Sequence, residues 1–300
     1  MKLARVIHQQ RIKLVLVEEE EQSVVLIGGA FAFDLNPVQT VIERRIREAE
    51  LRHVATGRAG FGDVAFLAPF SGLNRNVFAV GKNYVDHAVE FDKSGFNASS
   101  ATAIPAAPQF FTKATTSLAG PTDDIVFDPT NTSFVDYEGE IAVIIASDCR
   151  NVARGEAWDK VFGFVALNDV TARDLQRSHA QWFLGKSLDT FCPIGPWVTT
   201  LDQAPLDSLT VRTWVNDELR QEAPLTDLIF DVPTLIETLS RSITLLAGDI
   251  IATGTPAGVG IGFSPPRFLR DGDVVRVAAT GLGQLTNTVR VEKAIGISSM

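Results

Sequence analysis

The sequence predicts a mainly β protein with peripheral helices (α+β), arranged as a sandwich or roll. Of its 300 residues, 45% are hydrophobic, which is ample for a sizeable core. Short segments of strand type recur along the chain, and only a few helices interrupt them. Because the strands do not alternate regularly with long helices, a doubly wound parallel sheet is not expected.

Residues 1–72 are expected to form a small accessory domain. Two strand-type segments, 13–17 and 24–27, come first. A helix is expected over residues 38–50, where apolar side chains form a stripe between charged positions and Pro37 stands just before the start. A linker rich in proline, serine, glycine and asparagine follows at 69–74 and places the domain boundary near residue 72.

Residues 73–300 are expected to form the larger domain. Its clearest helix spans residues 233–240, with proline near the first position and Asp231 as the cap. Segment 96–108, rich in alanine, serine, asparagine and proline, is expected to be a loop. Strands are expected at residues 77–80, 109–112, 140–145, 161–167, 197–199, 209–215, 250–253, 274–278 and 288–291.

Two glutamates stand two residues apart where an apolar strand begins. Side chains at positions i and i+2 of a strand leave the same face, so Glu138 and Glu140 are expected to point together. Like charges held side by side against apolar neighbours are unfavourable unless a cation lies between them or one is protonated. The alternative is that both glutamates lie on the solvent face of an edge strand, where charged residues are common.

A third carboxylate follows the apolar segment 161–167, which places Asp169 at the end of a strand. After it, Thr171 as a cap with Asp174 three residues later predicts the start of a helix. Three carboxylates without a cysteine or histidine cluster suit Mg²⁺, with Mn²⁺ or Ca²⁺ as alternatives, and leave coordination positions for water and substrate oxygens. Glu138, Glu140 and Asp169 therefore form a candidate metal site of the open, catalytic type.

The segment after strand 77–80 contains the best candidate for a general base. If residues 85–92 are helical, His87 and Glu90 lie on one face. A carboxylate beside an imidazole fixes its tautomer and raises its basicity, so the two residues could form a catalytic dyad that deprotonates water. An ordinary exposed pair on a surface helix is the alternative.

Lys186 is a further candidate, because it follows three large apolar residues and a glycine. It could pair with a substrate carboxylate or a developing oxyanion, although a surface lysine at a turn fits the sequence equally well. The glycine-rich segment 254–262 lacks the lysine of a phosphate-binding loop, and Pro256 prevents its continuation into a helix. We expect it to be a turn-rich loop lining a cleft.

Composition limits the partners of the protein. A balance of 27 basic against 36 acidic residues argues against nucleic acid. The apolar runs are too short to span a membrane and the amino terminus has no signal-peptide pattern, so a cytoplasmic protein without a membrane partner is expected. Cys149 and Cys192 lack metal-like spacing and are expected to be free thiols.

Five segments together resemble the fumarylacetoacetate hydrolase family: 81–90, 136–140, 168–176, 185–193 and 248–260. The resemblance implies a mixed β-sandwich roll that forms a homodimer, with Mg²⁺ or a similar cation on Glu138, Glu140 and Asp169. It also implies a dyad of His87 and Glu90 on a segment that acts as a lid. Gln176, Lys186 and Thr255 are implied as substrate contacts, and for Gln176 and Thr255 the resemblance is the sole basis.

The family's chemistry implies a small anionic 2-oxo acid as the substrate, whose enolate the metal stabilises. We first expect hydrolysis of a C–C bond in acylpyruvate-like 1,3-diketo acids: His87, oriented by Glu90, deprotonates water, while Lys186 and Gln176 stabilise the alkoxide. The alternatives are a decarboxylase, hydratase or keto–enol tautomerase of oxaloacetate-like 2-oxo acids, and a metal-binding module without catalysis.

Overall fold

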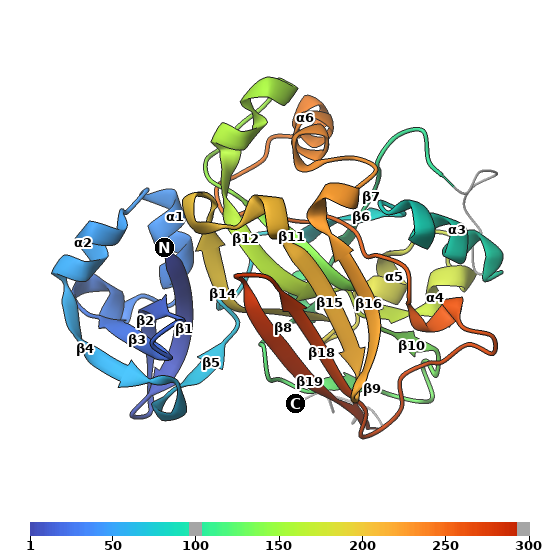
Figure 1. Cartoon of the computed structure of the whole chain (residues 1–300), viewed down its shortest axis with the longest axis horizontal. Coiled ribbons are helices and arrows are strands. Elements are labelled where there is room, and N and C mark those ends of the chain that lie inside the picture. The colour runs from blue at the N-terminus through green and yellow to red at the C-terminus, as the bar shows by residue number, and fades with distance from the viewer. Residues whose placement is uncertain (96–103, 293–300) are drawn as a thin grey trace, which may run out of the picture.

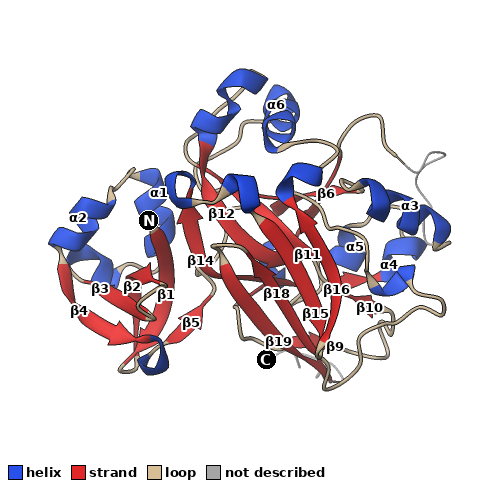
Figure 2. Cartoon of the chain, in the orientation of Figure 1, coloured by secondary structure: helices blue, strands red, loops and turns tan. Residues whose placement is uncertain are grey.

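The computed structural model describes residues 1–95 and 104–292. In this part of the chain, a twelve-stranded sheet and a five-stranded sheet pack against each other, and helices lie around them (Figures 1 and 2). The predicted class, mainly β with peripheral helices, is confirmed.

The large sheet joins the amino-terminal strands to the rest of the molecule. Strand β1 pairs antiparallel with β14, so no sheet boundary separates residues 1–72 from the remainder. The domain boundary near residue 72 stays a prediction. Along the sheet the strands are β4 (Ala55–Gly60), β3 (Ser23–Ile27), β2 (Arg11–Glu18), β1 (Lys2–His8), β14 (Cys192–Thr200), β12 (Val161–Asn168), β11 (Gly139–Ile145), β17 (Ile250–Ala252), β6 (Val77–Gly81) and β7 (Gln109–Lys113), while β5 (Ala65–Leu67) pairs with β1 and β8 (Leu118–Ala119) with β14.

The second sheet covers one face of the centre of the large sheet. Its strands in order are β16 (Glu218–Pro224), β15 (Thr210–Val215), β18 (Val274–Ala279), β19 (Gly283–Val291) and β9 (Ile125–Phe127). In β11, Val143 packs into the core shared with this sheet, whereas Ala142 and Ile144 pack into the core on the opposite face. Burial on both faces explains why residues 141–145 of β11 are all apolar. A separate two-stranded ladder pairs β10 (Val135–Asp136) with β13 (Thr171–Ala172).

Helices lie at the edges of the sheets, and α3, α4 and α5 gather at the end away from the amino-terminal strands (Figure 1). The α-helices are α1 (Pro37–Glu43), α2 (Glu48–His53), α3 (Val85–Lys93), α4 (Arg173–Ser178), α5 (Phe183–Lys186) and α6 (Val232–Ser242). Short 3₁₀ turns occur at Gly29–Phe33, Phe61–Asp63, Thr115–Ser117, Arg154–Lys160, Leu201–Gln203, Leu206–Ser208, Leu225–Asp227 and Gly260–Gly262.

Most of the predicted elements are observed. The predicted strands match within two residues, apart from 197–199 and 288–291, which are parts of the longer strands β14 and β19. Helix α6 includes the predicted span, and the carboxylate of its cap, Asp231, accepts a hydrogen bond from the backbone nitrogen of Thr234 at 3.1 Å. The helix expected over 85–92 is α3.

The single helix predicted over residues 38–50 is wrong, because the chain forms α1 and α2 with a turn between them. Arg45 in this turn has a left-handed backbone, with φ of 53°. The turn lets the Ile46 nitrogen bond to the carbonyl of Val41 at 3.0 Å, and Ile46 packs against the core beside α1. Burial of Ile46 therefore outweighs the local preference for a continuous helix.

The predicted cap at Thr171 is also wrong. Thr171 belongs to β13, and its hydroxyl donates to the Asp169 carbonyl at 2.9 Å instead of capping a helix. Helix α4 begins at Arg173, and the Asp174 carboxylate accepts a bond from the hydroxyl of Thr132 at 2.6 Å. Pairing with β10 thus replaces the local capping motif.

The loop predicted at 96–108 lies partly outside the described residues, since nothing is described for 96–103. Residues 104–108 form neither helix nor strand. Within the described residues, no helix is long and apolar enough to cross a membrane.

Candidate active site

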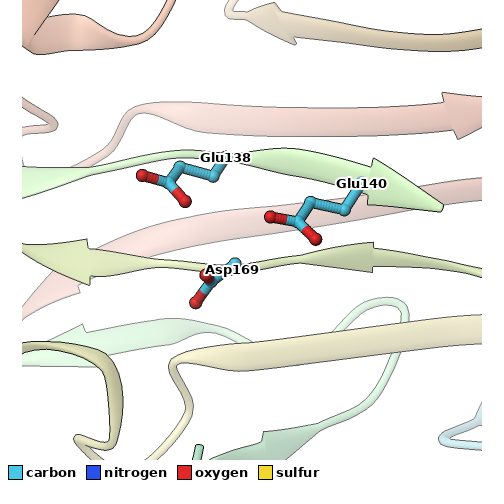
Figure 3. A group of neighbouring side chains, drawn as sticks. All are labelled: Glu138, Glu140 and Asp169. Atoms are coloured by element: carbon cyan, nitrogen blue, oxygen red, sulfur yellow. The ribbon is translucent and has the colours of Figure 1, made fainter. Parts of the chain in front are cut away.

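Three carboxylates meet where β11 begins and β12 ends. Glu138 lies just before β11, Glu140 is its second residue, and Asp169 follows the last residue of β12. A backbone hydrogen bond of 2.8 Å from the Asp169 nitrogen to the Glu138 carbonyl aligns these two segments of the chain. The three side chains lie close together on two adjacent segments (Figure 3), with ligand oxygens that all lie within 4.8 Å of each other.

The two glutamates point together and are buried, as the spacing predicts. Glu138 is 5% exposed and Glu140 is 1% exposed, so the solvent-face alternative is wrong. Asp169 is fully buried at the strand's end. The geometry of the predicted metal site is therefore present, and its role as a metal site is a proposal.

Buried cations compensate two of these carboxylates. The ammonium of Lys186 donates to Glu138 Oε2 and to Asp169 Oδ2, each at 2.6 Å. Arg173 Nη1 lies 2.7 Å from Glu138 Oε1, and Lys113 Nζ lies 2.5 Å from Asp169 Oδ1. Although burial opposes ionisation, Lys186 and then Arg173 hold the pKa of Glu138 at about 2. Lys186 is thus not a solvated surface lysine.

Glu140 differs, because its carboxylate accepts a hydrogen bond from the Gly254 nitrogen at 2.8 Å but has no ion pair among the described residues. Burial, then Asp169 and Glu138, raise the pKa of Glu140 well above its usual range. A cluster of hard oxygen donors in which Glu140 has no ion pair among the described residues fits a divalent cation of the Mg²⁺ or Mn²⁺ type.

The predicted dyad lies on α3 beside this cluster. His87 is 4% exposed, which excludes an ordinary surface pair, and its Nδ1 lies 3.4 Å from Glu90 Oε2. The Glu90 carboxylate also accepts bonds from the backbone nitrogen of Gly258 at 3.0 and 3.2 Å. The glycine-rich loop therefore fixes Glu90, and Glu90 in turn faces the imidazole.

A small pocket brings most of the predicted site residues together. His87, Glu138, Gln176, Lys186 and Thr255 all line it. The other three predicted residues do not line the pocket but contact residues that do. Glu90 contacts His87, and Glu140 and Asp169 lie next to Glu138. The roles assigned to these residues remain proposals.

Two of the predicted substrate contacts already have protein partners. The Thr255 hydroxyl donates to the Gly139 carbonyl at 2.9 Å and accepts a bond from Gln221 at 2.7 Å, so only an acceptor position is left for a ligand. The Gln176 carbonyl oxygen accepts a bond from Arg173 Nη1 at 3.1 Å, which leaves the amide N–H groups as the donors for a ligand.

Three aromatic rings form another wall of the pocket. The ring centroid of Trp182 lies 6.1 Å from that of Phe91 and 5.3 Å from that of Phe111. Trp182 also lies directly against Gly81, where a Cβ atom would lie 2.2 Å from the indole ring. Glycine at this position lets the ring close one side of the pocket.

Sequence reasoning missed Lys113, Arg173 and Asp136 as members of the site. Asp136 accepts bonds from Arg173 Nε at 2.9 Å and from the backbone nitrogens of Gly260 and Ile261 at 2.7 and 3.1 Å. It therefore ties the glycine-rich loop to Arg173. The available signal was a charge beside apolar residues, such as Lys113 directly after the strand predicted over 109–112.

Comparisons with known proteins agree with this architecture. The family model described as fumarylacetoacetate (FAA) hydrolase C-terminal matches residues 76–290. A relative, oxaloacetate tautomerase YisK of Bacillus subtilis (strain 168), is 46% identical over 229 residues, which cover 76% of this chain and 73% of that protein.

Two solved structures are similar over nearly the whole chain. Fumarylacetoacetate hydrolase from psychrophilic Exiguobacterium antarcticum matches with a TM-score of 0.82 at 40% identity, covering 97% of this chain and 100% of that chain. Maleylpyruvate hydrolase from Sphingobium sp. SYK-6, in complex with manganese(II) ion and pyruvate, matches with a TM-score of 0.77 at 32% identity, covering 98% of this chain and 100% of that chain.

Proposed function

We infer that this chain, which belongs to the fumarylacetoacetate hydrolase family, is a divalent-metal-dependent enzyme that interconverts the keto and enol forms of a short 2-oxo acid of the oxaloacetate class. One observation carries the proposal: a buried imidazole held by a carboxylate lines the same small pocket as the three-carboxylate cluster. The similarity to an oxaloacetate tautomerase supports this choice of reaction.

His87 is the proton carrier in this proposal. It takes a proton from C3 of the keto acid, and the electron pair of that C–H bond forms the C2–C3 double bond while the π pair of the C2 carbonyl moves to O2. The imidazolium of His87 then gives the proton to O2, which completes the enol. Glu90, fixed by Gly258, orients the imidazole. The reverse transfer regenerates the keto form, so the reaction is balanced without any co-reactant.

Lys186 supplies positive charge next to the substrate oxygen O2, on which negative charge develops during the reaction. Its ammonium uses two of its three N–H bonds on Glu138 and Asp169, which leaves the third for the substrate oxygen O2. Gln176 provides amide donors for the substrate carboxylate. A divalent cation held by Glu138, Glu140 and Asp169 supplies, when bound, further Lewis-acid stabilisation of the 2-oxo acid oxygens.

A specific observation favours a second candidate, hydrolysis of a C–C bond in acylpyruvate-like 1,3-diketo acids. The same pair of His87 and Glu90 could deprotonate water, and the chain is similar to a maleylpyruvate hydrolase whose structure contains manganese and pyruvate. The two reactions differ in product, because hydrolysis releases pyruvate and a second acid.

The test measures both reactions with Mn²⁺-loaded protein. Enol oxaloacetate is followed by loss of its ultraviolet absorbance, and acetylpyruvate by NMR detection of pyruvate and acetate. We expect the wild-type protein to ketonise oxaloacetate rapidly and His87→Ala to lower the rate at least about a hundredfold. The matched control is His53→Ala, since His53 is an exposed histidine on α2. Undiminished turnover in the His87 variant would overturn the base assignment, and cleavage of acetylpyruvate without ketonisation would select the second candidate.

The homodimer expected from the family resemblance stays a proposal. Size-exclusion chromatography with light scattering tests it directly. A mass near the 32.5 kDa of one chain would contradict it.

A further inference from the structure

Trp182 lines the pocket on the side that faces solvent. Of the described residues that line the pocket, Gly81, Phe111 and Trp182 are partly exposed, whereas all the others are buried. The buried ones include Glu138, which belongs to the carboxylate cluster, and Lys186, which is bound to it. The pocket therefore extends from the cluster toward a mouth that Gly81, Phe111 and Trp182 form.

Trp182 has the largest side chain at this mouth and is packed on three sides. Its indole lies edge-on against the rings of Phe91 and Phe111. On a third side it lies against Gly81, where the three atoms nearest to an added Cβ atom all belong to the indole. Because protein interiors are close-packed, a ligand in the pocket cannot push the ring toward these neighbours.

The backbone that carries Trp182 is fixed as well. Trp182 is the N-cap residue of α5, and α5 packs directly against the beginning of α4. A Cβ atom at Gly185 would lie 2.6 Å from the Gln176 nitrogen and 2.8 Å from the Ala172 carbonyl oxygen, so the two segments meet through their backbones. The indole is therefore a fixed wall, and its position limits what the pocket can hold.

The proposed function sets the direction of the substrate in the pocket. It places the carboxylate and the 2-oxo group at Glu138, Glu140 and Asp169, so the group attached to C3 points away from the cluster. That direction leads to the mouth, where Trp182 stands beside Phe111. The group on C3 is thus the part of the substrate that meets the indole.

We propose that Trp182 limits the size of the group on C3, and thereby selects short 2-oxo acids such as oxaloacetate over those with a bulky substituent. The inference rests on the proposed function, because that function orients the substrate. A rigid wall that excludes one substituent discriminates between substrates whose reacting atoms are the same. Trp182 is a specificity-determining residue in this arrangement and exchanges no proton.

The test uses oxamate and N-phenyloxamate, two unreactive analogues in which nitrogen replaces C3 of the 2-oxo acid and which differ only in a phenyl group. Calorimetry with Mn²⁺-loaded protein measures the affinity for each. We expect the wild-type protein to prefer oxamate and Trp182→Ala to reduce this preference at least about tenfold, as for relief of a steric exclusion. Trp182→Phe, with a smaller ring, should have an intermediate effect. Phe183→Ala is the matched control, since Phe183 is 40% exposed and does not line the pocket.

Gly81→Ala tests the same ring without removing it. The added methyl group must displace the indole, so the preference for oxamate should change at least about twofold, the lower end of the coupling between contacting residues. In a protein that already carries Trp182→Ala, the methyl group no longer meets its nearest neighbour, and Gly81→Ala should leave the preference unchanged. An equal effect of Gly81→Ala in both proteins would show that the indole does not set the size limit.

The outcomes separate this inference from the proposed function. Equal binding of the two analogues by the wild-type protein would overturn the inference, as would an oxamate preference that Trp182→Ala leaves unchanged. If the affinities follow the expectation while the wild-type protein fails to ketonise enol oxaloacetate, the size limit stands and the proposed reaction fails. If the wild-type protein ketonises the enols of oxaloacetate and phenylpyruvate with equal kcat/KM, the reaction stands and the size limit is wrong. Mn²⁺ affinity and Tm identify any variant that misfolds, and Trp182→Phe carries the test if Trp182→Ala is among them.

Discussion

Gly262 lies directly against the carboxylate of Glu90, so that a Cβ atom at position 262 would lie 1.8 Å from Glu90 Oε1. Gly258 binds the same carboxylate through its backbone nitrogen. Gly262→Ala is therefore expected to push Glu90 away from His87 and to lower kcat at least about tenfold, since misplacement by an ångström can cost a hundredfold.

Steady-state kinetics of Gly262→Ala checks this expectation, and Mn²⁺ affinity should be unchanged because Glu90 is not in the carboxylate cluster. Gly155→Ala is the matched control, since a Cβ atom at that position meets nothing within 4 Å. A normal kcat for Gly262→Ala would show that the position of Glu90 is unimportant for the reaction.

Glu140→Gln is expected to stabilise the metal-free protein and to weaken metal binding. The glutamine keeps an oxygen for the Gly254 nitrogen but removes a negative charge that is buried beside Asp169 and Glu138. The metal-free Tm should rise by a few degrees, as for a gain of about 1 kcal/mol, while the rise in Tm on adding Mn²⁺ should shrink. Differential scanning calorimetry with EDTA and with Mn²⁺ measures both. A metal-free Tm that falls would mean that the Glu140 charge is not a source of instability.

The stability of the metal-free protein should depend on pH through Glu140. Burial, then Asp169 and Glu138, raise its folded-state pKa, so its contribution to stability is complete below the unfolded pKa and is lost as pH rises through the folded pKa. The free energy of unfolding should therefore fall as the pH rises above the ordinary pKa of a glutamate. Urea denaturation in EDTA at several pH values measures the slope. Mn²⁺ should reduce this slope, because a cation favours the ionised carboxylate, and Glu140→Gln should reduce it without metal.

Lys113→Met should destabilise the protein strongly, although Lys113 does not line the pocket. Its ammonium is fully buried, lies 2.5 Å from Asp169 Oδ1 and also binds the backbone carbonyls of Val170 and Lys186. Removing one partner of a buried ion pair typically costs about 3–5 kcal/mol. Urea unfolding of the metal-free variant, compared with the exposed Lys93→Met, measures the loss. An equal stability of the two variants would contradict this account of Lys113.

Local patterns predicted the parts of the site that are local in sequence. Glu138 and Glu140 could be paired because side chains two apart on a strand share a face, and Asp169 because it follows an apolar strand. The position of Lys186 after large apolar residues indicated an unusual environment, but its two carboxylate partners depend on the fold.

The remaining features depend on contacts between distant segments. Lys113 reaches Asp169 because β7 pairs with β6 at the end of the large sheet. The pairing of β10 with β13 replaces the capping motif at Thr171, and burial of Ile46 ends α1 early. No periodicity in one segment could indicate these partners, since each is chosen by tertiary packing.

The strand β14 hydrogen-bonds to β1 on one side and to β12 on the other, and Asp169 directly follows β12. A shortened protein starting near residue 73 would lose β1 and leave the backbone at Val198 and Thr199 without its ladder partner. It would also uncover Trp197, which packs among side chains of the first strands. In such a fragment β14 would be an unpaired edge strand with exposed apolar side chains, one strand away from the carboxylate cluster. The fragment should therefore self-associate through β14.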